Sequence, residues 1–357
     1  MQKVLIQPTS YEECLPAVKR AFELFPIPMR GKKVFIKPNV LRCAWPEECI
    51  TTHPAILRAV VDCVEAEAPA EIIVGDNSGL SSYGINEKSF CQTGLMDAAK
   101  GYYQNIGLDS VILPFNPEYK EKVSVSRAVL EADVLISLPK FKTHGLTVLT
   151  GAIKNNYGIL PGAQKAVLHQ KAGSPARFHE MVVDVFKLRV PDLFIMDAVL
   201  AMQGNGPVST EFRYVGQILA ARNGVALDAV MARMAGVEPA NLRFLQKAVE
   251  EGLGAIEASA IELEGKLTAI PDFKLPPMSG DAHFASPRMI KVIQNRVELR
   301  PHADENLCTA CETCVEQCPV SALSMKGSLP EVDPDKCIIC FCCQEICPEK
   351  AIALKNE

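Results

Sequence analysis

The sequence predicts an α/β protein with a mostly parallel sheet, helices on both faces of that sheet, and a small additional α+β domain at its C-terminal end. Short apolar runs of strand length alternate with amphipathic segments over most of the chain, as in parallel sheets built from strand–helix–strand units. A stretch rich in Pro and Gly then precedes a cysteine-rich end. We therefore divide the 357 residues into an α/β domain (1–270), a linker (271–303) and a small domain (304–357).

The elements of the first domain follow from the spacing of apolar residues. Apolar positions three and four apart predict helices, and short Val-, Ile- and Leu-rich runs between turn residues predict buried strands. The predicted strands are 4–6, 34–36, 72–74, 111–113, 132–137, 193–196 and 216–221. The predicted helices are 11–25, 54–67, 88–105, 146–157, 176–189, 225–235 and 239–251.

The cysteine-rich end contains one motif twice, Cys-x-x-Cys-x-x-Cys-x-x-x-Cys-Pro. This is the spacing of bacterial ferredoxins, in which the fourth cysteine of each run binds the cluster of the other run. We expect one [4Fe–4S] cluster to be held by Cys308, Cys311, Cys314 and Cys347. We expect the second to be held by Cys337, Cys340, Cys343 and Cys318. The small domain is therefore predicted to be a ferredoxin-like domain with two [4Fe–4S] clusters.

Two other uses of these cysteines fit less well. Disulfide bonds need an oxidising compartment, and the chain starts without a signal-peptide pattern. Zinc sites usually use two Cys-x-x-Cys pairs and do not repeat a third cysteine and a Cys-Pro. Cys342 lies beside the motif, and we interpret it as a small apolar residue rather than as a ligand.

Charge and hydropathy exclude two kinds of partner. Residues 304–357 contain ten Asp and Glu against four Lys, so the net charge of −5 leaves the rest of the chain near +1. Residues 1–303 therefore lack the excess of basic residues that nucleic-acid binding needs. No apolar run reaches the roughly 18 residues that span a membrane. Fourteen cysteines without an export signal predict a cytoplasmic protein, and the expected partners are a small-molecule substrate and a redox partner (a ferredoxin, flavodoxin or reductase).

Polar residues follow four strands of the predicted sheet. They are Lys37 and Asn39, then Asp76, Asn77 and Ser78, then Lys140, Lys142, Thr143 and His144, and finally Asp197. Ligands bind outside the carboxyl ends of strands in open parallel sheets, so we expect a shared cleft there. The lysines favour an anionic ligand, although each residue alone is an ordinary loop residue. The candidate substrate-binding residues are Lys37, Asn39, Asp76, Lys142 and Lys154.

The candidate catalytic residues are Lys140, His144 and His169. An imidazole can protonate a substrate that has just accepted electrons, although a single histidine is more often structural. Lys154 shares a predicted helix face with Thr147, Thr150 and Gly151, which either faces a ligand or belongs to an ordinary amphipathic helix whose lysine reaches water. Asp76 fits a base, a cation ligand or a turn residue equally well.

The α/β domain resembles a known protein family. Two long runs carry the resemblance, residues 135–144 and 150–158, together with Lys37-Pro38-Asn39, Thr52-His53-Pro54 and Lys165-x-x-x-His169. They are similar to the family called domain of unknown function 362, over about residues 30–235, whose members often carry a C-terminal ferredoxin domain. The resemblance implies a cytoplasmic iron–sulfur protein of anaerobic or facultative metabolism, and it implies no particular reaction.

We therefore expect an iron–sulfur reductase. Low-potential electrons would pass from two [4Fe–4S] clusters to an anionic substrate, or to an additional unidentified cofactor, in the α/β cleft. The alternative is a non-catalytic electron carrier, cluster donor or redox sensor, because the sequence lacks a dinucleotide-binding motif and a phosphate-binding loop. Redox-neutral chemistry with structural clusters is a third reading.

Overall fold

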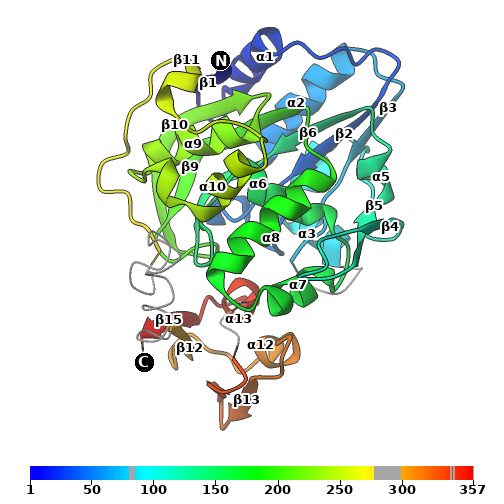
Figure 1. The fold of residues 1–357 in the computed structure, drawn as a ribbon. Helices are drawn as coiled ribbons and strands as arrows, with labels where there is room; N and C mark the ends of the chain where they lie inside the picture. The colour runs from blue at the N-terminus through cyan, green and yellow to red at the C-terminus, as the bar shows by residue number, and fades with distance from the viewer. Residues whose placement is uncertain (80–84, 277–298, 338–339, 341, 357) are drawn as a thin grey trace.

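The computed structural model describes residues 1–79, 85–276, 299–337, 340 and 342–356. These residues form a body with a central sheet between two layers of helices, and a small module at one edge of that sheet (Figure 1). The α/β fold class expected from the sequence is confirmed. Across the described ranges, every helix is too short or too polar to span a bilayer.

The strands of the main sheet come from almost the whole body. They are β1 (Gln2–Pro8), β2 (Lys33–Pro38), β3 (Glu71–Val74), β6 (Val134–Leu138), β7 (Lys140–His144), β8 (Val148–Thr150), β9 (Leu193–Gln203), β10 (Glu211–Ala221) and β11 (Ile261–Glu264). Their order is β11-β1-β10-β9-β6-β2-β3, with β7 beside β9 and β8 beside β7. Among the described strands, β10 runs antiparallel to β9 and β1, and β8 antiparallel to β7. The other pairings are parallel, so the sheet is mostly parallel as expected.

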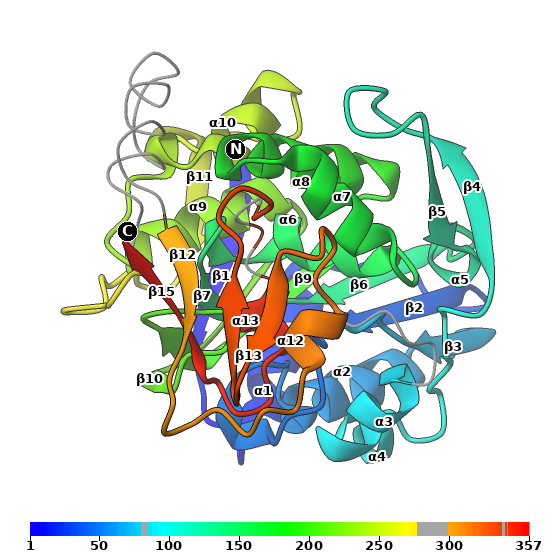
Figure 2. The ribbon, with the colours of Figure 1, turned by 90° about the horizontal axis from the view of Figure 1, so that it is seen from below.

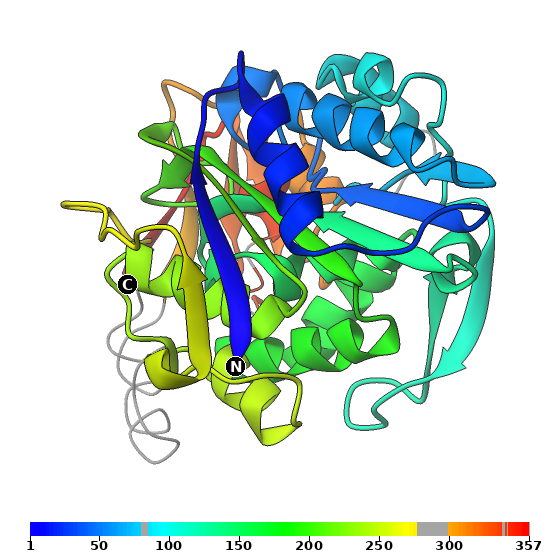
Figure 3. The same ribbon diagram turned by 90° about the horizontal axis from the view of Figure 1, so that it is seen from above.

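Helices cover both faces of this sheet (Figures 1 and 3). One face carries α6 (Ala152–Asn155), α7 (Gln164–Ala172), α8 (Pro175–Leu188), α9 (Gly224–Met234) and α10 (Arg243–Glu250). The other face carries α1 (Cys14–Leu24), α2 (Pro54–Ala66), α3 (Ile85–Gln92) and α4 (Leu95–Ala98). The sequence of β2 is continuously apolar because both faces of the strand are buried. Val34 and Ile36 enter the core with α1 and α2, and Phe35 enters the core on the other face of the sheet.

The remaining elements of the body lie outside the main sheet. β4 (Ser110–Pro114) and β5 (Lys122–Ser126) form an antiparallel hairpin that leads into α5 (Arg127–Leu130). Short 3-10 turns are η1 (Pro46–Glu48), η2 (Asn156–Ile159), η3 (Pro239–Asn241) and η4 (Ala258–Ala260).

The C-terminal module lies over the edge of the sheet at which the parallel strands end (Figure 2). It contains β12 (Leu299–Ala303), α12 (Thr313–Glu316), β13 (Leu323–Lys326), β14 (Leu329–Val332), α13 (Cys342–Ile346) and β15 (Ile352–Asn356). β12 pairs with β15, and β13 pairs with β14. Residues 299–303, which we assigned to the linker, thus form a strand of this module, whereas 277–298 lie outside the described residues.

Two predicted helices are wrong. Residues 88–105 hold the end of α3 and all of α4, separated by Gly94 at φ +73°, and Tyr103 then bridges to Val74 of β3. Residues 146–157 hold β8 and only then α6, whose first amides, those of Ala152 and Ile153, donate to the Asp228 carboxylate. The expected helix face through Thr147 and Lys154 therefore does not exist.

Candidate functional site

The ends of β2 and β3 meet in a buried ion pair. Lys37 Nζ lies 2.7 Å from Asp76 Oδ1, and the two side chains are almost completely inaccessible to solvent. Asp76 also accepts a hydrogen bond of 2.8 Å from the Val40 amide. A Cβ atom at Gly158 would lie 2.1 Å from Asp76 Oδ1, so glycine is needed there to let the backbone pass. Lys37 is therefore held inside the body.

A second buried ion pair lies where β7 runs beside β9. Lys140 Nζ donates to Asp197 Oδ2 and to the Tyr11 hydroxyl, both at 2.8 Å. Tyr11 donates in turn to Asp197 Oδ1 at 3.1 Å, and the His53 amide donates to Oδ2 at 2.9 Å. Burial raises the pKa of Tyr11, so its hydroxyl stays protonated. The Lys140 ammonium is therefore already bound by residues of the body.

Lys142 and Asn39 connect this edge to α6. Lys142 Nζ donates to Asn39 Oδ1 at 2.8 Å and to the Ile50 carbonyl at 2.6 Å. Asn39 Nδ2 donates to Asn155 Oδ1 at 3.1 Å. Burial lowers the pKa of Lys142 to about 7, so its ammonium is easily deprotonated.

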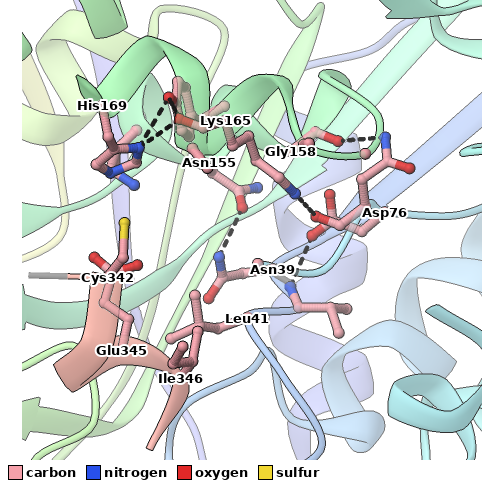
Figure 4. A pocket seen from close by; sticks show the side chains of 18 of the residues that line it. Asn39, Leu41, Asp76, Asn155, Gly158, Lys165, His169, Cys342, Glu345 and Ile346 are labelled. Carbon is pink, nitrogen blue, oxygen red and sulfur yellow. Dashed lines mark hydrogen bonds between the residues drawn. The ribbon is translucent and has the colours of Figure 1, made fainter. Parts of the chain in front are cut away.

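A cavity of about 90 Å³ lies between the body and the module (Figure 4). Its walls come from the ends of β2 and β3, from α6 and α7, and from α13. The polar lining residues include Asn39, Asp76, Asn77, Lys154, Asn155, Tyr157, Lys165, His169, Gln317, Cys342 and Glu345. A smaller adjoining cavity of about 40 Å³ shares Asn39, Lys154 and Asn155 with it and adds Lys140, Lys142 and His144.

Lys154 and Lys165 bring two ammonium groups to the larger cavity. Lys154 makes no hydrogen bond or ion pair with any residue that the structure describes, and its Nζ lies 4.9 Å from the Tyr157 ring centroid and 5.5 Å from that of Phe178. Burial lowers its pKa. Lys165 donates to the carbonyls of Asn77 and Ser78, and burial lowers its pKa to about 7.

His169 presents a hydrogen-bond acceptor to the cavity. Its Nδ1 lies 2.7 Å from the Lys165 carbonyl, and a carbonyl can only accept, so Nδ1 carries the proton. Burial lowers the pKa of His169 to about 4, which keeps the ring neutral near pH 7. Nε2 is thus an unprotonated nitrogen, and it has no partner among the described residues. The sequence predicts a proton donor at this position, whereas the neutral ring presents an acceptor to the cavity.

His144 has the opposite tautomer. Its Nδ1 accepts from the Leu146 amide at 3.0 Å, so in the neutral ring the proton is on Nε2, which lies 3.0 Å from Glu345 Oε1 of the module. Burial lowers the pKa of His144 to about 4. Burial alone raises the pKa of Glu345, but the contact with His144 and the nearby charge of Lys154 outweigh it and lower that pKa to about 2. Near pH 7 the pair is therefore a neutral imidazole beside a carboxylate.

α13 contributes to cavities on two sides. Cys342 and Glu345 line the cavity between body and module, and the Cys342 sulfur points toward His169 (Figure 4). Cys343, the next residue, lines a cavity inside the module. Lys350 adds an ion pair of 3.0 Å with Glu48 of the body, which holds the module against this edge together with the His144–Glu345 contact.

The eight cysteines of the repeated motif line two separate cavities inside the module. Cys308, Cys311, Cys314 and Cys347 line one of about 20 Å³. Cys318, Cys337, Cys340 and Cys343 line another of about 20 Å³. These are the two sets that the sequence predicted, each with its fourth cysteine from the other run. In the described part, no three His, Cys, Asp or Glu side chains are placed to hold one metal ion. A [4Fe–4S] cluster makes a different demand, because each of its four iron atoms takes one cysteine.

The sequence-predicted residues are brought together only in part. Asn39, Asp76, Lys154 and His169 line the larger cavity, whereas Lys140, Lys142 and His144 line the smaller one and Lys37 lies behind Asp76. Sequence reasoning missed Lys165, Tyr157, Cys342 and Glu345 as lining residues. The four-residue spacing of Lys165 and His169 on α7 was a usable signal, because it places both on one helix face.

The fold defines an α/β protein with a small cysteine-rich module. Residues 34–233 match the family model described as domain of unknown function (DUF362), and residues 300–348 match a 4Fe-4S dicluster domain. The chain belongs to the DUF362 family, as its motifs implied. The second match supports [4Fe–4S] clusters and a capacity for electron transfer.

The chain is also similar to a curated protein and to two solved structures. The chain is 32% identical over 277 residues to the thylakoid-associated protein sll1697 of Synechocystis sp., covering 73% of this chain and 81% of that one. A crystal structure from Thermotoga maritima is similar at 12% identity and a TM-score of 0.38, covering 69% of this chain and 59% of that one. The lactate racemase apoprotein from Thermoanaerobacterium thermosaccharolyticum is similar at 13% identity and a TM-score of 0.41, covering 66% of this chain and 58% of that one. The chain spans less than two thirds of either structure, and likeness at this level defines no function.

Proposed function

We propose that the protein is an iron–sulfur reductase that passes low-potential electrons to a small anion bound between the body and α13. The observation that carries the proposal is the double role of α13. Cys343 on this helix lines a four-cysteine cavity, while its neighbour Cys342, together with Glu345, lines the larger cavity. Adjacent residues of one helix thus belong to both cavities.

The eight motif cysteines would hold two [4Fe–4S] clusters. Each set of four surrounds a cavity whose other walls are mainly apolar, for example Val320, Leu323 and Val332 in one of them. The amides of Ala322 and Ala351 donate to the sulfurs of Cys318 and Cys347 at 3.2 and 3.3 Å. When bound, such clusters supply single electrons, and hydrogen bonds to the sulfurs tune their potential.

Lys154 and Lys165 are the cations that would hold the substrate. Lys154 keeps all its N–H donors available within the described residues, and Lys165 uses two for backbone carbonyls. Ammonium groups in a site shielded from water stabilise the negative charge that develops when an acceptor is reduced. Lys165, with a pKa near 7, is the group best suited to give a proton at neutral pH.

The other predicted residues take supporting roles in this proposal. Lys37 and Lys140 balance buried aspartates, and Lys142 links Asn39 to the Ile50 carbonyl. His144 meets Glu345 and so positions α13 rather than the substrate. The cytoplasmic location and an external redox partner remain predictions from the sequence.

The reductase proposal is tested by reoxidation of the reduced protein. Anaerobically reduced protein is mixed with a panel of small carboxylates and oxyanions, and the return of cluster absorbance is followed. At least one anion should speed reoxidation, and Lys154→Met should slow it about tenfold or more. Lys171→Met, an exposed lysine on the same helix as Lys165, is the matched control and should react like wild type. A panel in which no anion acts, or a Lys154→Met variant that reacts normally, contradicts the proposal.

The cluster assignment is tested by two neighbouring cysteines. Two clusters predict about eight irons per chain. Cys343→Ser should lose up to half of this iron, whereas Cys342→Ser should keep all of it, because only Cys343 lines a four-cysteine cavity. Equal losses in both variants would overturn the assignment. Metal and flavin analysis of the same samples decides whether the body holds an additional cofactor.

An electron carrier or redox sensor is the second candidate. It is favoured by the internal pairing of Lys37 and Lys140, because much of the positive charge at the sheet edge is already balanced. A carrier predicts that reoxidation depends on a redox protein and on no small anion.

A further inference from the structure

The larger cavity contains a hydrogen-bond acceptor, His169 Nε2, that has no partner among the described residues. The His169 side chain is buried and its Nε2 has no hydrogen-bond partner in the described part of the chain. Its other nitrogen is tied as a donor to the Lys165 carbonyl, so Nε2 can only accept from a neutral ring. Leaving a buried acceptor unpaired is costly, and a ligand with a donor would relieve that cost.

The same cavity contains a cation without an acceptor. Among the described residues, nothing accepts a hydrogen bond from Lys154, whose ammonium rests against the rings of Tyr157 and Phe178. His169 packs against the same Phe178 ring, with the centroids 4.4 Å apart. One small molecule can therefore contact both the Lys154 ammonium and the His169 ring.

The charges of the lining favour a monoanion. Below the Lys165 pKa of about 7, Lys154 and Lys165 are cationic, Glu345 is anionic, and Asp76 is balanced by Lys37. At such pH values the sum is close to one positive charge. A zwitterion such as an amino acid would leave that charge unbalanced, whereas a carboxylate with a neutral donor would balance it.

The volume fits a few non-hydrogen atoms. A buried cavity of about 150 Å³ accommodates benzene, which has six. The cavity here is about 90 Å³, which suits a molecule of three to five non-hydrogen atoms.

We propose that this cavity binds a small hydroxycarboxylate, with its carboxylate on Lys154 and its hydroxyl donating to His169 Nε2. This inference rests on the proposed function, for which it names the class of substrate or product. Glycolate is the smallest probe that carries both groups. Acetate lacks the donor, and glycine replaces the neutral donor with a cation.

Binding is measured by calorimetry on the oxidised full-length protein, so no electron transfer is involved. Glycolate should bind about tenfold more tightly than acetate, which is the value of one hydrogen bond, and more tightly than glycine. His169→Phe, which keeps a ring beside Phe178, should abolish the difference between glycolate and acetate. Lys154→Met should weaken both.

Three outcomes would overturn the inference. They are equal binding of glycolate and acetate to wild type, a preference for glycine, and no binding of any probe. The wild-type comparison stands even when a variant fails to fold. Reoxidation by other anions would leave the reductase proposal intact while this one fails.

Discussion

Two sets of buried lysines lie at the same edge of the sheet, and they differ in what they contact. Lys37 and Lys140 each form a short ion pair with a buried aspartate, at 2.7 and 2.8 Å. Lys154 has no such partner among the described residues and lies against aromatic rings beside a cavity. Burial of charge is common to both sets, so burial alone does not mark the functional site. The functional site is marked instead by hydrogen-bond donors and acceptors that have no partner among the described residues.

The largest difference in folding stability is expected when one lysine is removed from each set. Lys140→Met leaves Asp197 buried without its cation and should destabilise the fold by about 3–5 kcal/mol. Lys154→Met removes no ion pair and should change the stability by about 1 kcal/mol or less. Anaerobic urea unfolding of the two variants measures both effects. Similar losses in the two would contradict the division into paired and unpaired lysines.

A smaller loss is expected from crowding the Lys37–Asp76 pair. Gly158→Ala would place its Cβ 2.1 Å from Asp76 Oδ1 and 2.7 Å from Lys37 Nζ, so the pair must move. We expect a loss of about 3 kcal/mol, the upper range for an overpacked core. Gly236→Ala is the matched control, since its φ is +75° with no atom within 4 Å, and it should cost only about 1 kcal/mol of backbone strain. The same urea measurement compares them, and a cheaper Gly158→Ala would show that the pair is loosely held.

The pH dependence of stability tests how strongly burial shifts the pKa of Lys165. Burial lowers its pKa from 10.5 to about 7, so between pH 7 and 10 the unfolded chain binds the proton and the folded protein does not. Stability contributed through this residue therefore rises with pH in that window, by at most about 2 kcal/mol between pH 7 and 9. Lys165→Met should flatten this rise in the unfolding midpoint. Parallel curves for variant and wild type would mean that folding does not lower the pKa of Lys165.

The sequence was informative about the sheet edge and less so about the cavity. Apolar strands predicted where Lys37, Asp76 and Lys140 would stand, because strand ends converge in parallel sheets. Their partners depend on tertiary packing, and Lys140 meets Asp197 because β9 continues past the expected strand 193–196. Cys342 could not be placed from its own motif. Its position depends on how the module docks on the body, whose residues at this cavity (39–169) precede it by more than a hundred residues.

The cysteine motif was the most predictive part of the chain. Its spacing predicted two sets of four cysteines, and in the structure each set lines its own cavity. Local spacing suffices there because short loops bring three of the four thiols together. The two wrong helices show the opposite case, since Gly94 and the Asp228 contacts to α6 override the apolar periodicity.

The most direct test of the account is whether the ligand cavity and the cluster module are coupled through α13. The electron paramagnetic resonance spectrum and midpoint potentials of the reduced protein are measured with and without saturating glycolate. We expect a changed spectrum or potential in wild type, and no change in Lys154→Met. If glycolate binds by calorimetry but leaves both unchanged, the cavity and the clusters are independent and the proposed coupling through α13 is wrong.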